Sequence, residues 1–167
     1  MNIKTQEELF VRLLSNVKQG TERTTKILQE FGDLAEDPDI KEAFEARAFV
    51  SGQVLAKLDR CFKMIGAEPV KGSEQIHDVF VEAFRNEFAE IQTPAARKLF
   101  VLAKATQLLH LRIAEYVALT AMADVTGHYG VGVLLETCLA DKLVFVERTK
   151  RLLKNIAEIK VLEKMAR

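Results

Sequence analysis

Apolar residues recur every three or four positions through most of the chain, a spacing that places them on one face of an α-helix. The first such stretch opens with Thr5 and Glu8 in capping-box order, in which each side chain bonds a free backbone N–H at the helix start. We therefore expect a helix over residues 5–34. Its predicted inner face carries Leu9, Leu13, Val17, Thr24, Ile27, Leu28 and Phe31.

Three further stretches show the same helical spacing. Asp37-Pro38 is a typical N-cap followed by a first-turn proline, and the pattern after it ends near Gly66. Thr93-Pro94 repeats this start, and its pattern continues to a break over residues 127–130. We expect the last helix to run from there to about residue 164. No segment alternates apolar and polar residues between turn pairs, so strands are not expected.

The segment from Pro69 to Pro94 is too long to be a hairpin loop. It has a short helical pattern of its own, formed by Ile76, Phe80, Phe84 and Phe88. Short links join the other helices in pairs, so the long segment can travel the length of the bundle. The pattern predicts an all-α fold, a ferritin-like four-helix bundle with a long crossover containing a short helix.

Length and composition fit one folded domain. The chain has 167 residues, of which 49% are apolar, 29% are charged and only 3 are proline. We expect residues 1–167 to form a single ferritin-like domain with a sizeable core. The 24 basic and 24 acidic residues balance, which removes the broad attraction on which binding to nucleic acid or an anionic membrane depends.

Cysteine use and the absence of long apolar runs bear on location. Cys61 and Cys138 form neither a disulfide framework nor a zinc motif. The N-terminal residues lack the apolar region of a signal peptide, and later apolar stretches are interrupted by charges. We therefore expect reduced thiols in a cytoplasmic protein that does not enter membranes.

The stretch from Thr93 to Ile156 carries most of a family resemblance. It contains Glu115-Tyr116-Val117-Ala118-Leu119, then Gly127, then Leu134-Leu135-Glu136-Thr137-Cys138-Leu139-Ala140-Asp141-Lys142. With the opening Lys4–Phe10 and Ala43-Phe44, this order resembles the bacterial ferritin-like stress-protein family that includes YciE and YciF. The resemblance covers nearly the whole chain and rests on the order and spacing of several short motifs together.

Members of that family look like carboxylate-bridged dimetal proteins, in which Glu and His residues from four helices meet at the bundle centre. Most positions that the resemblance aligns with ligands are substituted here, namely Thr21, Arg47, Phe49, Val50, Leu109, Arg112 and Lys142. The residual candidates for metal binding are Glu22, His110 and Asp141. We expect a degenerate site without metal or other cofactor; the alternative is iron or manganese at the residual residues.

Three of the substituted positions carry cations. We expect the long side chains of Arg47, Arg112 and Lys142 to reach solvent. The alternative is that they stay buried and neutralise the remaining acids in place of a metal. His110 is expected to be a half-buried structural histidine, and Asp141 an ion-pair partner.

The other histidines and the second cysteine have no ligand partners nearby in the sequence. His77 falls in the crossover and His128 in the last turn, so we expect both at the surface. Cys138 falls on an apolar helix face, where a small buried thiol is expected rather than a nucleophile.

The resemblance implies a stress-associated protein. The substituted ligand positions predict that it is non-catalytic and acts by self-association or by binding an unidentified protein partner. The stripe Phe80, Phe84 and Phe88 is expected mainly in the core, yet it also offers a surface that pairs two bundles into a homodimer. One alternative is a metal-dependent oxidase, ferroxidase or catalase-like enzyme with an atypical residual site. Another is an apolar-ligand cavity beside Phe49, Val50 and Leu109. Nucleic-acid and membrane partners are not expected.

Overall fold

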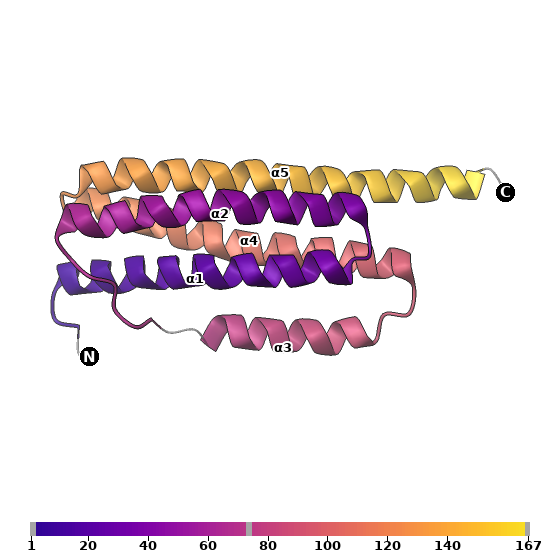
Figure 1. Ribbon diagram of the computed structural model, residues 1–167, viewed down its shortest axis with the longest axis horizontal. Helices are drawn as coiled ribbons and strands as arrows, with labels where there is room; N and C mark the ends of the chain where they lie inside the picture. Colours follow the sequence, from indigo (N-terminus) through magenta and orange to yellow (C-terminus); the bar gives the residue numbers. More distant parts are fainter. Residues whose placement is uncertain (1–2, 73–74, 166–167) are drawn as a thin grey trace.

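The computed structural model describes residues 3–72 and 75–165, which form five helices and no strand. The helices are α1 (Gln6–Leu34), α2 (Pro38–Ile65), α3 (Gln75–Ala89), α4 (Pro94–Val125) and α5 (Tyr129–Met165). The four long helices run side by side, and the shorter α3 lies along α1 and also contacts α4 (Figure 1). The predicted four-helix bundle with a crossover helix is confirmed. None of the helices in this described part is long and apolar enough to cross a membrane.

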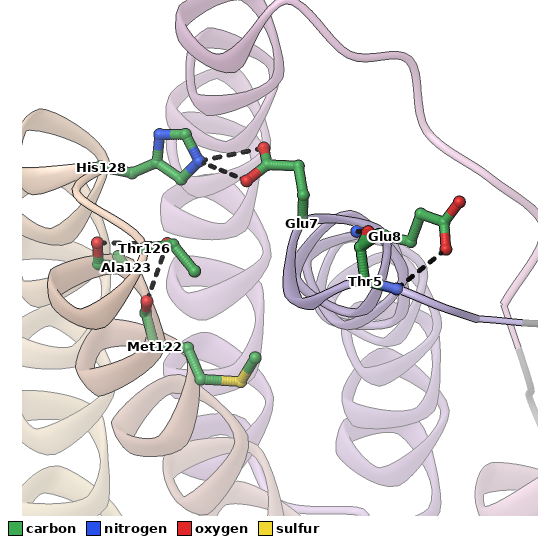
Figure 2. A network of polar contacts seen from close by, with 7 residues as sticks. All are labelled: Thr5, Glu7, Glu8, Met122, Ala123, Thr126 and His128. Atoms are coloured by element: carbon green, nitrogen blue, oxygen red, sulfur yellow. Dashed lines mark hydrogen bonds and ion pairs between the residues drawn. The ribbon is translucent and has the colours of Figure 1, made fainter.

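The helix ends follow the capping chemistry of the sequence. The Thr5 hydroxyl accepts a hydrogen bond from the Glu8 N–H, and the Glu8 carboxylate accepts one from the Thr5 N–H (Figure 2). The side chains of Asp37 and Thr93 accept hydrogen bonds from backbone N–H groups in the first turns of α2 and α4, and each is followed by proline. Gly66 ends α2 with φ +66°, a left-handed conformation that glycine adopts without steric conflict. The predicted starts of α1, α2 and α4 and the predicted end of α2 therefore have a local physical cause.

His128 ties the turn between α4 and α5 to the start of α1. Its Nε2 lies 3.0 Å from a Glu7 carboxylate oxygen, as Figure 2 shows. Its ring stacks on Phe10 with 5.3 Å between ring centroids. The side chain is consequently half-buried rather than fully at the surface. The contact joins the start of α1 to the turn between α4 and α5 at one end of the bundle.

The core consists of two apolar clusters, one toward each end of the bundle. The Phe31 cluster lies near the turn between α1 and α2 and near α3. Its buried members are Ile27, Leu28, Phe31, Ala35, Ile40, Ala43, Phe44, Phe84, Val101, Leu102, Ala105, Leu108, Leu109 and Phe145. The Phe10 cluster lies near the turn between α4 and α5. Its buried members are Phe10, Leu14, Val17, Val54, Leu58, Cys61, Phe62, Tyr116, Leu119, Ala123, Val131, Leu135 and Cys138.

The buried thiols in the Phe10 cluster are inert. The prediction that Cys138 is a buried cysteine is confirmed, and Cys61 is buried with it. Burial raises the pKa of Cys61 to about 12 and also raises the pKa of Cys138. Because the thiolate is the nucleophile, neither cysteine is set up for catalysis.

The inner face of α1 is rotated slightly from the predicted one. Phe10 is 0% exposed, whereas Leu9 is 37% exposed. The buried positions alternate in steps of four and three residues, which is the spacing of a helix-packing seam: Phe10, Leu14, Val17, Thr21, Thr24, Leu28 and Phe31. Leu9 lies outside that seam, so placing it on the inner face was wrong; Leu13 is partly buried and packs against the Phe10 cluster, as predicted.

The phenylalanine stripe of α3 faces the bundle. Phe84 is 1% exposed, and its ring centroid lies 3.9 Å from that of Phe31 and 5.4 Å from that of Phe100. Phe80 and Phe88 pack against the same cluster. The predicted core role is confirmed, and the pairing of two bundles through the partly buried Phe80 and Phe88 stays a prediction.

His77 lies on the same inward face of α3, seven residues before Phe84. It is buried, and its Nε2 lies 3.5 Å from the Thr24 hydroxyl oxygen. Its predicted place at the surface is therefore wrong. The reason is that α3 packs directly on α1, which covers this face of the crossover.

The packing predicts that Phe84 anchors α3 to the bundle. Phe84→Ala removes a stacked, fully buried ring and should lower the free energy of unfolding by about 3–5 kcal/mol. The matched control is Val79→Ala, because Val79 lies on the exposed side of the same helix; its effect should stay within about 0.5 kcal/mol. Urea denaturation followed by circular dichroism measures both. Equal losses in the two variants would contradict this packing.

Candidate functional site

A polar layer separates the two apolar clusters at the middle of the bundle. Each long helix contributes to it at a position between members of the two clusters. We define the cationic layer as Thr21 and Thr24 of α1, Arg47 and Ser51 of α2, Arg112 of α4 and Lys142 of α5, all of which are buried. With Leu109, these residues line a cavity of about 10 Å³. The layer is the most unusual chemical feature of the described core.

The three cations are buried rather than solvated. Arg47, Arg112 and Lys142 are 4%, 1% and 2% exposed, so the expectation that they reach solvent was wrong. Each stands on the inward seam of its helix, as Arg47 does three residues after buried Phe44. A side chain on that seam is directed toward the bundle axis, and the neighbouring helices block its way to water.

Arg112 is held by α1 and by its own helix. Its Nη2 donates a hydrogen bond of 2.7 Å to the Val17 carbonyl, and its guanidinium forms an ion pair with Glu115. Gly20 makes this approach possible, because a Cβ at that position would overlap the guanidinium. Glycine is therefore needed here for space.

Lys142 lies against an aromatic ring that is itself fixed by a hydrogen bond. Its Nζ is 4.0 Å from the centroid of the Tyr116 ring, a cation–π distance. The Thr21 hydroxyl donates to the Val17 carbonyl at 2.8 Å. The Tyr116 hydroxyl, 3.1 Å from the Thr21 oxygen, is therefore the donor in that contact.

The layer carries more positive charge than its hydrogen bonds satisfy. Nε and Nη1 of Arg47, Nε of Arg112 and Nζ of Lys142 are buried without a hydrogen-bond partner among the described residues. Burial lowers the pKa of both guanidinium groups. Burial, followed by the two neighbouring arginines, sets the pKa of Lys142 well below its usual range. Burial also raises the pKa of Glu115, an effect that Arg112 opposes.

The chain matches a known protein family over most of its length. The family model described as "Domain of unknown function (DUF892)" matches residues 5–166. The chain belongs to this family. Protein YciF of Escherichia coli (strain K12) is 23% identical over 161 residues, which cover 93% of this chain and 95% of YciF. The predicted YciE/YciF-type relationship is confirmed.

Solved structures show the same fold. The E. coli stress protein YciF superposes with a TM-score of 0.86 at 20% identity, covering 93% of this chain and 99% of YciF. YcfI from Rhodopseudomonas palustris gives 0.83 at 22% identity over 89% of this chain and 95% of its own. Ferritin-like diiron-carboxylate proteins from Bacillus anthracis give 0.68 at 16% identity, covering 90% of this chain and 99% of theirs. The all-α ferritin-like architecture is thereby confirmed.

The residual metal candidates do not meet in this DUF892 chain. Glu22 and His110 are exposed, and the His110 Nδ1 donates to the Thr106 carbonyl of its own helix at 2.8 Å. That bond suits the predicted structural histidine. The prediction that its side chain is half-buried was wrong, because it is exposed. The Asp141 carboxylate accepts a hydrogen bond of 3.0 Å from Lys57, as expected of an ion-pair partner.

Helix geometry explains this dispersal. Each residue advances about 100° around an α-helix. Glu22 follows buried Thr21, and His110 precedes buried Arg112 by two residues, so both candidates are turned away from the bundle axis. In the described part of the chain, no group of three or more His, Cys, Asp or Glu side chains could hold a metal ion.

Some of the substituted ligand positions line the central cavity, and others lie away from it. Thr21 and Leu109 line the cavity together with the three cations, as predicted. Phe49 is 73% exposed, so its place in the former site was wrong. Val50 packs against the Phe10 cluster instead of lining the cavity.

Four contributors to the layer were missed by the sequence reasoning: Thr24, Ser51, Glu115 and Tyr116. Arg47 and Ser51 are four residues apart and share a face, which leaves Phe49 on the opposite side of α2. A polar break in an otherwise apolar seam would have identified Thr24 and Ser51. The cavity volume of about 10 Å³ is room for about one water-sized species, which contradicts the expectation of a cavity that holds an apolar ligand.

The side chains present do not fit the dimetal centre that the family resemblance implies. Divalent iron or manganese needs several anionic oxygen or neutral nitrogen donors. The residues that line the cavity are two arginines, a lysine, two threonines, a serine and a leucine, so no carboxylate, imidazole or thiolate lies among them. Ammonium and guanidinium groups have no lone pair to give a metal while they are protonated, so no reaction step is assigned to a metal here.

The role of Gly20 leads to a prediction. Gly20→Ala should displace the Arg112 guanidinium from the Val17 carbonyl and lower the free energy of unfolding by about 1–3 kcal/mol. The matched control is Gly52→Ala on α2, because a Cβ at Gly52 meets no atom within 4 Å. That substitution should be neutral or stabilise by up to about 1 kcal/mol. Urea denaturation compares the two, and an unchanged stability for Gly20→Ala would contradict the assigned position of Arg112.

Proposed function

We propose that this chain is a non-catalytic ferritin-like protein of the YciE/YciF type that acts in the cytoplasm through association with itself or with a protein partner. The observation that carries the proposal is the chemistry of the bundle centre. Arg47, Arg112 and Lys142 occupy positions that the resemblance aligns with metal ligands, and all three are buried there. A stress-associated role is included because the relative YciF is described as a stress protein.

Electrostatics supports a centre without a dimetal cluster. A divalent ion about 6 Å from one unit positive charge is repelled by roughly 6 kcal/mol at an effective dielectric constant of about 20. Three buried cations multiply that repulsion, and Glu115 already forms an ion pair with Arg112. The alternative of a metal-dependent oxidase, ferroxidase or catalase-like enzyme lacks a converging donor set in the described residues.

Metal reconstitution tests the proposal. After incubation with ferrous iron or manganese and desalting, the protein should retain well under one metal ion per chain. Peroxide turnover and ferrous oxidation should match a protein-free control. Asp141→Ala and His110→Ala should leave both readouts unchanged, because neither side chain lines the central cavity.

The opposite outcome is equally clear. Near-stoichiometric metal that disappears in Asp141→Ala and His110→Ala, together with turnover, would overturn the proposal and establish the enzyme alternative. Metal content is measured by inductively coupled plasma mass spectrometry on protein purified without a chelating tag.

A row of exposed apolar residues on α5 supports self-association. Tyr129, Val133, Ala140 and Val144 are exposed and are spaced by four, seven and four residues, so they share one face of the helix. This α5 row replaces the α3 phenylalanines as the proposed surface for a homodimer, because those phenylalanines face the core. Exposed Glu136 and Glu147 lie on the same face, Glu136 between Val133 and Ala140 and Glu147 beyond Val144, so the row combines apolar and acidic side chains.

Sedimentation velocity over a range of concentrations tests this surface. The native chain should show a monomer–dimer equilibrium. The double variant Val133→Glu/Val144→Glu should raise the Kd of the dimer roughly tenfold or more, because two like-charged carboxylates from each chain would meet across the interface. Val79→Glu introduces a charge at an exposed valine of α3 and serves as the control. A native chain that stays monomeric at every concentration would contradict the α5 surface. So would a dimer that is weakened by Val79→Glu but not by the double variant.

A further inference from the structure

The cationic layer leaves an electrostatic imbalance inside the bundle. Arg47, Arg112 and Lys142 carry three positive charges, and Glu115 supplies the carboxylate that pairs with one of them. Asp141, which directly precedes Lys142 on α5, is hydrogen-bonded to Lys57. A neutral Lys142 would still leave two guanidinium groups against one carboxylate. The imbalance therefore persists in either protonation state of the lysine.

The unpaired donors belong to side chains that line the cavity. The buried nitrogens that lack hydrogen-bond partners among the described residues belong to Arg47, Arg112 and Lys142, and all three side chains line the cavity. Thr24 and Ser51 also line it. Buried donors of this kind are ordinarily paired, and a buried charge is ordinarily balanced. The cavity is thus built to receive an acceptor with negative charge.

The size of the cavity limits which anion it accepts. Its volume is about 10 Å³, which is room for about one water-sized species. A tetrahedral oxyanion such as phosphate or sulfate needs space for five heavy atoms and does not fit. We propose that this cavity binds a single monatomic anion of the halide class, chloride under cellular conditions, between Arg47, Arg112 and Lys142.

The bound anion would take the structural place of a central cofactor. It would accept hydrogen bonds from donors that are otherwise unpaired and lower the mutual repulsion of three buried cations. The position of Lys142 over the Tyr116 ring suits a charged ammonium group. Burial and the two arginines lower the pKa of that group, and an adjacent anion would raise it again. The alternative way to relieve the repulsion is an empty or water-filled cavity with a neutral lysine.

This inference rests on the proposed centre without metal, and the two can fail separately. A centre that binds neither halide nor metal would overturn the halide site and leave the proposed function standing. A centre that binds stoichiometric iron or manganese would overturn both. Halide and metal binding are therefore measured on the same preparation of the full chain.

Thermal unfolding at constant ionic strength is the first experiment. Sodium gluconate is replaced stepwise by sodium chloride, so that screening of surface ion pairs stays the same while chloride increases. Tm should rise along a saturating curve, by roughly 5–10 °C when chloride exceeds its Kd about 100-fold. Sodium bromide should act like chloride, and sodium phosphate at matched ionic strength should give no saturating rise.

Charge-matched variants locate the effect. Lys142→Met should weaken chloride binding at least tenfold, and it should still fold because replacing a buried charge with an apolar side chain is often neutral or stabilising. The control is Lys150→Met, which removes the same charge from an exposed position on the same helix. Its chloride response should equal that of the native chain.

Crystallography with bromide gives a readout that does not depend on stability. Crystals grown in sodium bromide should show an anomalous peak within hydrogen-bonding distance of Arg47 and Lys142, and crystals of Lys142→Met should lack it. Equal Tm values in chloride and gluconate, a chloride response retained in Lys142→Met, or a native crystal without the peak would each overturn the proposal. A saturating response to phosphate would overturn the restriction to monatomic anions.

Discussion

Burial of three positive charges between two apolar clusters is the constraint on which the centre of this bundle depends. Several local features follow from it. Gly20 leaves room for the Arg112 guanidinium, and the Val17 carbonyl accepts its hydrogen bond at 2.7 Å although that carbonyl lies inside α1. Tyr116 presents its ring to Lys142 because the Thr21 hydroxyl holds its phenol group. These features make sense together as provisions for buried charge, and none is required by an apolar core.

The layer is not explained by stability alone. A buried charge loses its hydration, and replacing buried ionic groups by well-packed apolar residues is often neutral or stabilising. Leucine or methionine in place of Arg47 and Lys142 would extend the two clusters into one continuous core. What the layer does provide is alignment, because sliding one helix by a turn would move a cation into an apolar cluster. It also leaves a cavity of about 10 Å³ among charged and hydroxyl-bearing residues, which an apolar core would close.

The fold was largely predictable, and the site was predictable only in part. Helix ends at Thr5, Asp37 and Thr93 were found because capping is local chemistry that a few residues specify. The positions of Phe49 and His110 were wrong because matching motifs by residue type does not determine helix rotation, and two residues turn a side chain by about 200°. The burial of Arg47, Arg112 and Lys142 depends on neighbouring helices that approach from distant parts of the chain, so no local pattern could decide it.

Family membership and central chemistry are separate properties of this chain. The ferritin-like frame brings one or two inward positions from each of four helices to the same level, and that convergence is a matter of helix packing. Carboxylates at those positions create a place for divalent cations. Cations and hydroxyls at the same level, as at Arg47, Ser51, Arg112 and Lys142, reverse the sign of the local field, so the charge of the preferred guest reverses too. The fold therefore supplies a central binding position, and the side chains of this sequence direct it toward an anion.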